Sequence, residues 1–229
     1  MPDWSIVNAN TLSVIILAGG RSSRMGRDKA TIEIAGVPLI RHIYDVVAGC
    51  RERSDGVATD EHGAIATDDP LALAGRIYVV TPWAQKYRSI LPATCQFIPE
   101  PQPHRGPLIA FSQGLATIDS DWMLLLACDL PNLATPVVQT WIDGLPSVPA
   151  QSIAYLPRHP HKGLEPLCGF YRRSCRQSAH EYIASGGQSF QGWLKMHPVT
   201  ELIVSESRWL LNCNTPADLA TIGENRSLP

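Results

Sequence analysis

The sequence predicts a single α/β domain built around a largely parallel sheet. Short apolar segments alternate with helix-like segments along most of the 229 residues, which is the pattern of strands joined by crossover helices. A chain of this length can bury a sizeable core, and no linker divides residues 1–229 into two parts. Hydrophobic residues make up 45% and charged residues 17%, as in ordinary soluble globular proteins.

The expected elements of the first half follow in a regular order. The apolar run Ser13–Ala18 is typical of a buried central strand. A helix is expected over Gly36–Cys50, because Pro38 suits a first helical turn and four apolar residues share one face: Leu39, Ile43, Val46 and Val47. Two more strands come next, Arg76–Thr81 and Cys95–Pro99, with a short helix around Gln85–Leu91 between them.

The second half continues the alternation. A helix is expected over Gly106–Ile118, and the most apolar strand of the chain over Asp121–Asp129. Thr135 and Thr215 each precede a proline, which predicts two further helices with threonine as the N-cap. The segment Arg51–Gly75 breaks the pattern, because it is acidic, long and rich in Gly, Ala, Thr and Asp. It is interpreted as a mobile surface insertion.

Charge and cysteine usage exclude several classes of protein. The net charge of −2 provides no overall attraction to nucleic acid or to an anionic membrane. No apolar run approaches the roughly 20 residues of a membrane span, and the N-terminal segment lacks a signal-peptide pattern. The six cysteines are scattered without a C-x-x-C pair, so reduced thiols, several of them in the core, are expected in a cytoplasmic protein.

The stretch VIILAGGRSSRMGRDKA, Val14 to Ala30, carries the strongest chemical signal. A strand that ends in Gly-Gly allows backbone N–H groups to approach a ligand closely. In open α/β sheets, ligands bind beyond the carboxyl ends of the strands, where Arg and Lys side chains can hold a polyphosphate. The spacing fits neither G-x-x-x-x-G-K-[ST] nor G-x-G-x-x-G. A charged surface turn is the alternative for any one of these residues, but it accounts poorly for the whole arrangement.

LAGGRSSRMGRDK (Leu17–Lys29) resembles the L-A-G-G-x-x-x-R-M-G-x-D-K loop of nucleotidyltransferases, and among them it is most similar to molybdenum cofactor guanylyltransferases. Further segments match the family in order and approximate spacing: IAGVPLI (34–40), EPQPHRGPLIAF (100–111), ACDLP (127–131), EPLCGFYRR (165–173) and NCNTPADL (212–219). The resemblance implies a single-domain, Rossmann-like nucleotidyltransferase fold whose mostly parallel central sheet is flanked by helices. It also implies Mg²⁺-dependent transfer of GMP from GTP to molybdopterin or Mo-molybdopterin, with release of pyrophosphate.

The same resemblance assigns roles to individual residues. Asp129 is the implied magnesium ligand and also contacts the nucleotide, and its position after an apolar strand suits a ligand at the sheet edge. Lys29 is expected to contact the phosphates, and Arg24 to neutralise charge on the leaving pyrophosphate; these two and Asp129 are the catalytic candidates. The backbone contacts to the nucleotide are expected from Leu17, Ala18, Gly19 and Gly20. Capping of a helix before Pro131 is the alternative role for Asp129.

Other matches are less direct. Glu100 lies near a family aspartate that contacts the nucleotide, although a solvated acid between prolines is the alternative. Thr81 stands where the family has an asparagine. Asn212 and Asn214 match a late motif close to the metal or the acceptor phosphate, and structural capping of backbone groups is the alternative for both.

Three functions remain open from the sequence. The first is the guanylyltransferase. The second is a relative that uses another base or acceptor, such as a molybdopterin cytidylyltransferase or a sugar-phosphate nucleotidyltransferase. The third is a non-catalytic nucleotide-binding module, which the joint presence of Arg24, Lys29 and Asp129 argues against. The resemblance also implies transient contact with other proteins of molybdenum cofactor biosynthesis or with the apo-enzymes that receive the cofactor.

Overall fold

Seven strands of the central sheet lie in the order β10-β7-β9-β6-β1-β4-β5, and β8 pairs with β7 at the side. The computed structural model describes residues 11–19, 28–52, 73–100, 105–159, 163–213 and 218. Within these residues the sheet strands are β1 (Leu12–Leu17), β4 (Ile77–Thr81), β5 (Gln96–Pro99), β6 (Trp122–Ala127), β7 (Ala154–His159), β8 (Gly163–Leu164), β9 (Cys168–Arg172) and β10 (Val199–Leu202). A separate hairpin joins β2 (Glu33–Ile34) to β3 (Val37–Pro38).

The sheet is mostly parallel, as the sequence predicts. β1 pairs in parallel with β4 and β6, and β4 with β5, whereas β9 runs antiparallel between β6 and β7. Along the order β5-β4-β1-β6 the chain winds away from β1 in both directions, so that a crevice opens at the carboxyl ends of β1 and β6. This switch point is where a ligand is expected in a doubly wound sheet.

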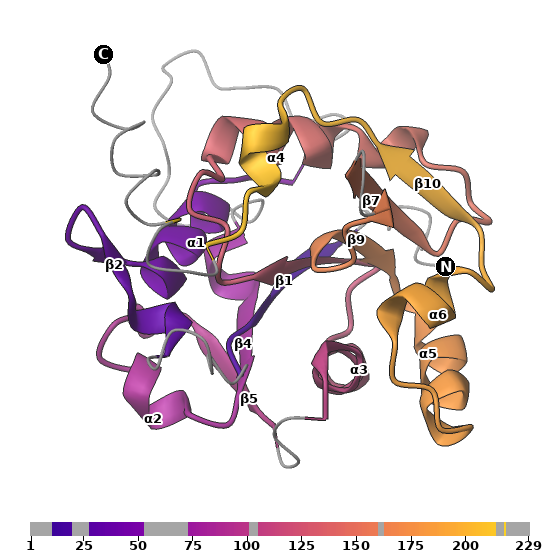
Figure 1. The fold of residues 1–229 in the computed structure, drawn as a ribbon, viewed down its shortest axis with the longest axis horizontal. Coiled ribbons are helices and arrows are strands. Elements are labelled where there is room, and N and C mark those ends of the chain that lie inside the picture. The colour runs from indigo at the N-terminus through magenta and orange to yellow at the C-terminus, as the bar shows by residue number, and fades with distance from the viewer. Residues whose placement is uncertain are drawn as a thin grey trace, which may run out of the picture.

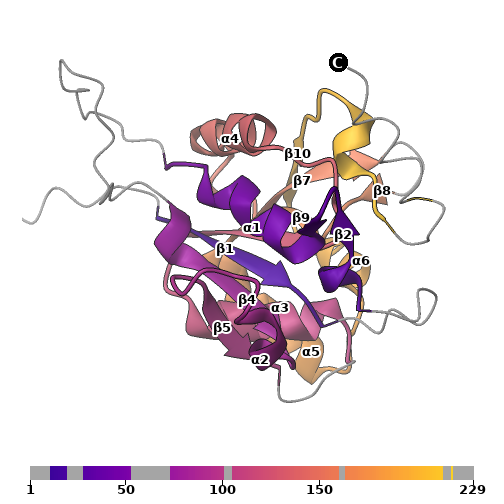
Figure 2. The same ribbon diagram turned by 90° about the vertical axis from the view of Figure 1, so that its left-hand side faces the viewer.

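Helices cover both faces of the sheet (Figures 1 and 2). On one face, α1 (Leu39–Ala48) and α4 (Thr135–Asp143) pack in the same apolar cluster as the side chains of Val14 and Ile16. On the other face, α3 (Pro107–Thr117), α5 (Arg176–Ala184) and α6 (Phe190–Leu194) share a cluster with Ile15. The alternation of Val14, Ile15 and Ile16 between the two clusters follows from the two-residue period of a strand and explains why β1 is apolar throughout.

The second face requires a close approach of helix and strand. A Cβ atom added at Gly114 of α3 would lie 2.7 Å from Cδ1 of Ile15. Glycine therefore allows α3 to lie directly on β1. None of the helices in the described ranges is both long enough and apolar enough to cross a membrane.

Two helix starts differ from the sequence prediction. The helix expected over Gly36–Cys50 begins only at Leu39, because Val37 and Pro38 form a strand of the small hairpin. The prediction of Thr135 as an N-cap is wrong: Ala134 occupies the N-cap position of α4, and Thr135 is the first helical residue. The Thr135 hydroxyl instead donates to the carbonyl of Val46, 2.9 Å away, and so ties α4 to α1. The corresponding prediction for Thr215 lies outside the described residues.

The interpretation of 51–75 as a mobile insertion concerns mainly residues 53–72, of which the structure describes none. The described ends of that segment belong to the packed structure. Glu52 is buried and accepts hydrogen bonds from the Leu12 amide and from Arg76, and Leu73 is fully buried. All six cysteines are buried and free, as expected from their scattered spacing.

Candidate nucleotide site

A cleft of about 570 Å³ opens at the carboxyl ends of β1, β5 and β6. Six of the residues proposed from the sequence line it: Leu17, Ala18, Gly19, Lys29, Glu100 and Asp129. They come from segments that are far apart in the sequence, from Leu17 to Asp129, and the parallel sheet brings them together because its strand ends share one edge. Gly20 and Arg24 lie outside the part of the chain that the structure describes.

Asp129 lies in the turn that follows β6, and its side chain faces Lys29. The Nζ atom of Lys29 donates to Oδ2 of Asp129 at 3.3 Å, and the two side chains are only 22% and 17% exposed. Among the described residues no helix begins at Asp129, so the capping role is wrong. Its backbone carbonyl accepts from the Cys213 amide at 2.9 Å, which joins the turn to the segment near Asn212.

Glu100 follows β5 directly and is 6% exposed, so the alternative of a solvated loop acid is wrong. Its carboxylate approaches the backbone at Gly19 so closely that a Cβ atom there would overlap Oε2. A side chain at residue 19 would therefore displace the carboxylate. Gly19 and Glu100 together form one wall of the cleft.

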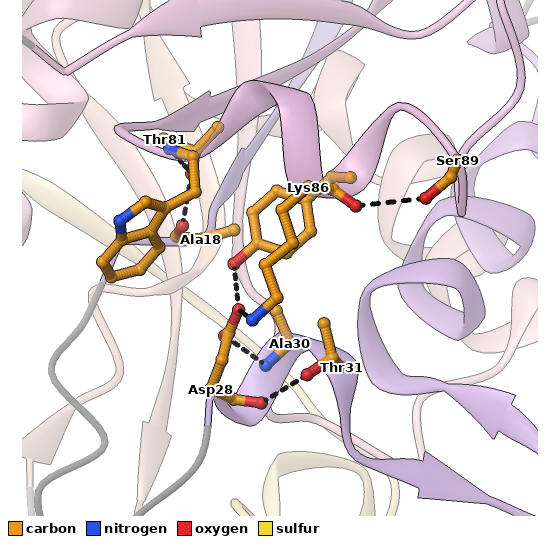
Figure 3. A network of polar contacts seen from close by, with 9 residues as sticks. Ala18, Asp28, Ala30, Thr31, Thr81, Lys86 and Ser89 are labelled. Atoms are coloured by element: carbon orange, nitrogen blue, oxygen red, sulfur yellow. Dashed lines mark hydrogen bonds and ion pairs between the residues drawn. The ribbon is translucent and has the colours of Figure 1, made fainter.

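Thr81 has a structural role that the sequence did not reveal. Its hydroxyl donates to the carbonyl of Ala18 at 2.7 Å and accepts from the Trp83 amide at 3.0 Å. Thr81 is 1% exposed. It therefore fixes the end of β1 to the end of β4 just below the cleft, as Figure 3 shows for Thr81 and Ala18.

Asp28 is a cleft residue that was not among the proposed site residues. Its carboxylate caps the short 3₁₀ turn Lys29–Thr31 and is bound by Lys86 and Tyr87 of α2 (Ala84–Tyr87). The motif G-x-D-K contains Asp28, and this was the available signal. Nothing local in the sequence indicates the contacts from α2, because they depend on the tertiary packing of that helix.

Cys128 lies beside Asp129 but is a packing residue. Burial raises the pKa of the Cys128 thiol well above its usual value, and the neighbouring carboxylates of Asp129 and Asp28 raise it further. The thiol is therefore neutral at physiological pH and a poor nucleophile. The described lining of the cleft supplies the ammonium group of Lys29, the carboxylates of Asp28, Glu100 and Asp129, and the backbone at the end of β1, an arrangement suited to positioning phosphates rather than to covalent catalysis.

A second cavity of about 170 Å³ adjoins the cleft. Both are lined by Ala127, Asp129 and Leu167, and the smaller one also contains Glu165 and Asn212. Asp129 therefore lies between the two cavities. Asn214, the partner of Asn212 in the sequence motif, is outside the described ranges.

Known proteins match the chain over most of its length. The MobA-like NTP transferase domain matches residues 14–200. A "probable molybdenum cofactor guanylyltransferase" of Trichormus variabilis is 47% identical over 93% of this chain and 91% of the relative. One from Synechococcus elongatus is 36% identical over 90% of this chain and 95% of the relative.

A solved structure supports the same fold. The molybdopterin-guanine dinucleotide biosynthesis protein A of Archaeoglobus fulgidus superposes with a TM-score of 0.70 at 20% identity, covering 94% of this chain and 98% of that one. At this identity the likeness establishes the architecture, and the closer relatives establish the family. The chain belongs to the molybdenum cofactor guanylyltransferases of the MobA-like NTP transferase family.

Proposed function

We propose that the protein transfers GMP from GTP to molybdopterin or Mo-molybdopterin, forming the guanine dinucleotide cofactor and releasing pyrophosphate. One observation carries the proposal: a single cleft joins the end of the glycine motif, Lys29, the buried Glu100 and Asp129, and a second cavity meets it at Asp129. Two adjacent spaces on either side of one carboxylate suit a nucleotide and an acceptor that must meet.

We assign the triphosphate of GTP to the part of the larger cleft that Lys29 lines. Leu17, Ala18 and Gly19 would contact the nucleotide with their backbone, and Lys29 would bind the phosphates as a compact charge. We assign Arg24 to the leaving pyrophosphate on the strength of its place in the motif. Such a transfer depends on in-line positioning and on stabilisation of developing charge, and needs no nucleophilic side chain.

We assign the guanine base to the part of the same cleft that Glu100 lines. A carboxylate only accepts hydrogen bonds, and guanine presents two adjacent donors, N1–H and the N2 amino group. Adenine, cytosine and uracil have no such donor pair on that edge. A buried carboxylate such as Glu100 would therefore favour GTP, and its nearness to Gly19 places it within the same cleft.

Asp129 fits a magnesium ion that is shared with the substrate. Magnesium is commonly held by one or two carboxylates together with phosphate oxygens and water, and the described residues contain no cluster of three or more His, Cys, Asp or Glu that would enclose a metal by themselves. Asp129 is partly exposed and faces the cleft. When bound there, Mg²⁺ would neutralise phosphate charge during the transfer.

The acceptor is assigned to the smaller cavity. Asn212 lines it, and the hydrogen bond between the Cys213 amide and the Asp129 carbonyl keeps this segment close to the turn after β6. Asn212 would orient the acceptor phosphate, with Asn214 as its partner from the motif. We assign the reaction to the cytoplasm, an assignment supported by six free buried thiols.

The proposal is tested by the shift in unfolding temperature with GTP, ATP, CTP and UTP, each with and without Mg²⁺. A ligand that binds only the native state raises stability by RT ln(1 + [L]/Kd), so the four nucleotides can be ranked directly. We expect the largest magnesium-dependent shift with GTP. A preference for CTP or UTP would move the protein to another branch of the fold, and no shift with any nucleotide would contradict the nucleotide site.

A further inference from the structure

The carboxylate of Asp28 is bound from three directions by described residues. Oδ1 accepts from the Ala30 amide at 3.1 Å, and Oδ2 accepts from Lys86 Nζ at 2.6 Å and from the Tyr87 hydroxyl at 2.8 Å. Figure 3 shows Asp28 facing Lys86 on one side and the turn at Ala30 and Thr31 on the other. The carbonyl of Asp28 also accepts from the Thr31 hydroxyl at 3.0 Å.

These contacts determine the start of the turn that carries Lys29. Asp28 is the N-cap of the 3₁₀ turn Lys29–Thr31, so its orientation sets the direction in which Lys29 leaves the backbone. Lys29 then reaches Asp129 on the far side of the cleft. A change in the Asp28 carboxylate is therefore transmitted to Lys29 through a single peptide unit.

One segment binds the chain on both sides of residues 20–27: it contacts Ala18 before them and Asp28 after them. Thr81, at the end of β4, binds the carbonyl of Ala18, and Lys86 and Tyr87 of the following helix bind Asp28. Only four residues separate Thr81 from Lys86, so the two attachments form one local unit. We call residues 81–87 the clasp. It contacts the chain before and after residues 20–27, which themselves lie outside the described ranges.

The clasp also has an electrostatic role. Asp28 lines the cleft, and an uncompensated carboxylate there would repel a triphosphate. Lys86 places a positive charge against Asp28, whose side chain is only 15% exposed although that of Lys86 is 48% exposed. Tyr87 is fully buried, and its hydroxyl donates to the same oxygen of Asp28. The pair thus both neutralises and orients the carboxylate.

We infer that Lys86 and Tyr87 are positioning residues of the nucleotide site, which act through Asp28 to direct Lys29 toward the phosphates and to shield them from the Asp28 charge. The identity of the ligand rests on the proposed function. The alternative is an ordinary surface ion pair with no effect on binding, which is common for exposed lysines. The two differ in whether the effect of Lys86 depends on Asp28.

The test is a double-mutant cycle on GTP binding, measured by titration calorimetry. Lys86→Met should weaken GTP binding about tenfold, a coupling typical of directly bonded charged pairs. Lys86→Arg should restore it, because the charge is retained. In an Asp28→Asn background, which keeps the capping oxygen but removes the charge, Lys86→Met should have no further effect. Lys195→Met, which removes one exposed lysine charge at the end of α6, is the matched control and should leave binding unchanged.

Tyr87→Phe supplies a second, independent variant. It removes only the hydroxyl, and we expect GTP binding to weaken while the KM for the acceptor stays the same. A general loss of structure would instead weaken the binding of both GTP and the acceptor, and it would lower the unfolding temperature of the nucleotide-free protein.

Three outcomes are decisive. Non-additive effects of Lys86→Met and Asp28→Asn support the clasp. Wild-type affinity in the Lys86→Met and Tyr87→Phe variants, or an equal loss with and without the Asp28 charge, overturns it while the proposed function stands. A wild-type chain that binds no nucleotide overturns the proposed function and the clasp together.

Discussion

Lys29 and Asp129, which are 100 residues apart in the sequence, meet across the cleft with 3.3 Å between Nζ and Oδ2. Charge-assisted hydrogen bonds are usually about 2.7–2.9 Å long, so the hydrogen bond between Lys29 and Asp129 is longer than usual. Two groups joined by such a long hydrogen bond can exchange it for other partners. We expect Lys29 to turn to the phosphates and Asp129 to the metal when both are bound.

Replacing Asp129 by asparagine tests that exchange. Asp129→Asn should lower kcat about 10²- to 10³-fold, because the carboxylate that would hold Mg²⁺ is lost and the developing negative charge on the phosphates is then less well neutralised. Without magnesium, the same variant should bind GTP at least as tightly as the wild type, since a negative charge facing the phosphates has been removed. Steady-state kinetics and calorimetry measure the two effects. Near wild-type turnover would exclude Asp129 as the metal ligand.

Replacing Lys29 by alanine should act mainly on the nucleotide. Hydrogen bonds to charged groups contribute about 1.5–3 kcal/mol, which corresponds to a rise in KM for GTP of about 10- to 150-fold. The unfolding temperature of the free variant is recorded as well, because the two side chains are only 22% and 17% exposed and Asp129 loses this ion pair in Lys29→Ala. The measurement is KM for GTP and for the acceptor in parallel, and an unchanged KM for GTP would remove Lys29 from the site.

The close approach of Gly19 and Glu100 predicts that a methyl group added at residue 19 weakens GTP binding. Gly19→Ala places its Cβ atom onto Oε2 of Glu100, so the carboxylate must move and GTP binding should weaken. Gly75→Ala is the matched control, because its Cβ atom would meet nothing within 4 Å. Both variants should retain the far-ultraviolet circular dichroism of the wild type. Equal GTP affinity in the two variants would contradict the assignment of this wall to the nucleotide.

Base selection should depend on the charge of Glu100. Glu100→Gln puts an amide donor where only acceptors were, so one of the two hydrogen bonds to guanine is lost or becomes repulsive. We expect the preference for GTP over ATP and CTP to fall about 10-fold or more, since each lost bond leaves a buried group unpaired. The readout is the ratio of kcat/KM for the nucleotides. A Gln variant that keeps the full preference would show that guanine is recognised elsewhere.

The buried thiols predict a loss of stability at alkaline pH. Burial raises the pKa of Cys50 from 9.0 to about 12 and that of Cys95 from 9.0 to about 11. In the unfolded chain these thiols lose their protons near pH 9, whereas the native chain still holds them. The unfolded state therefore binds fewer protons, and the free energy of unfolding falls as the pH rises from about 9 toward the native values.

Urea denaturation at pH 8 and pH 10 measures that loss. Cys50→Ala should show a smaller decrease between the two pH values than the wild type, because one raised pKa has been removed. An equal decrease in both proteins would mean that the Cys50 thiol contributes nothing to the alkaline transition.

Much of the fold could be predicted from the sequence because it depends on local patterns. The apolar runs at β1 and β6 were placed within about one residue of their observed bounds, apart from the polar end of the longer expected strand at Asp129. The helix at Leu39–Ala48 was placed too early at its start, because a proline suits both a first helical turn and a strand end. Thr135 was misassigned since its hydroxyl binds α1, a contact that no local pattern contains.

The site was predictable to the extent that its residues belong to contiguous motifs. Lys29 and Asp129 each follow a recognisable segment, and the parallel sheet then brings them together. Burial of Glu100 could not be predicted, because prolines on both sides are equally compatible with a solvated loop. Lys86 and Tyr87 were missed for a similar reason: their partner Asp28 is almost 60 residues earlier, and only tertiary packing joins them.

The most direct measurement is the transfer itself. Purified protein, GTP, Mg²⁺ and molybdopterin would be incubated together, and pyrophosphate and the dinucleotide product would be quantified, with the Asp129→Asn variant as the control. The account predicts equal amounts of the two products, formed with GTP in preference to CTP and ATP and nearly absent in the variant. Product formed equally well from CTP, or in the absence of a functional Asp129, would contradict it.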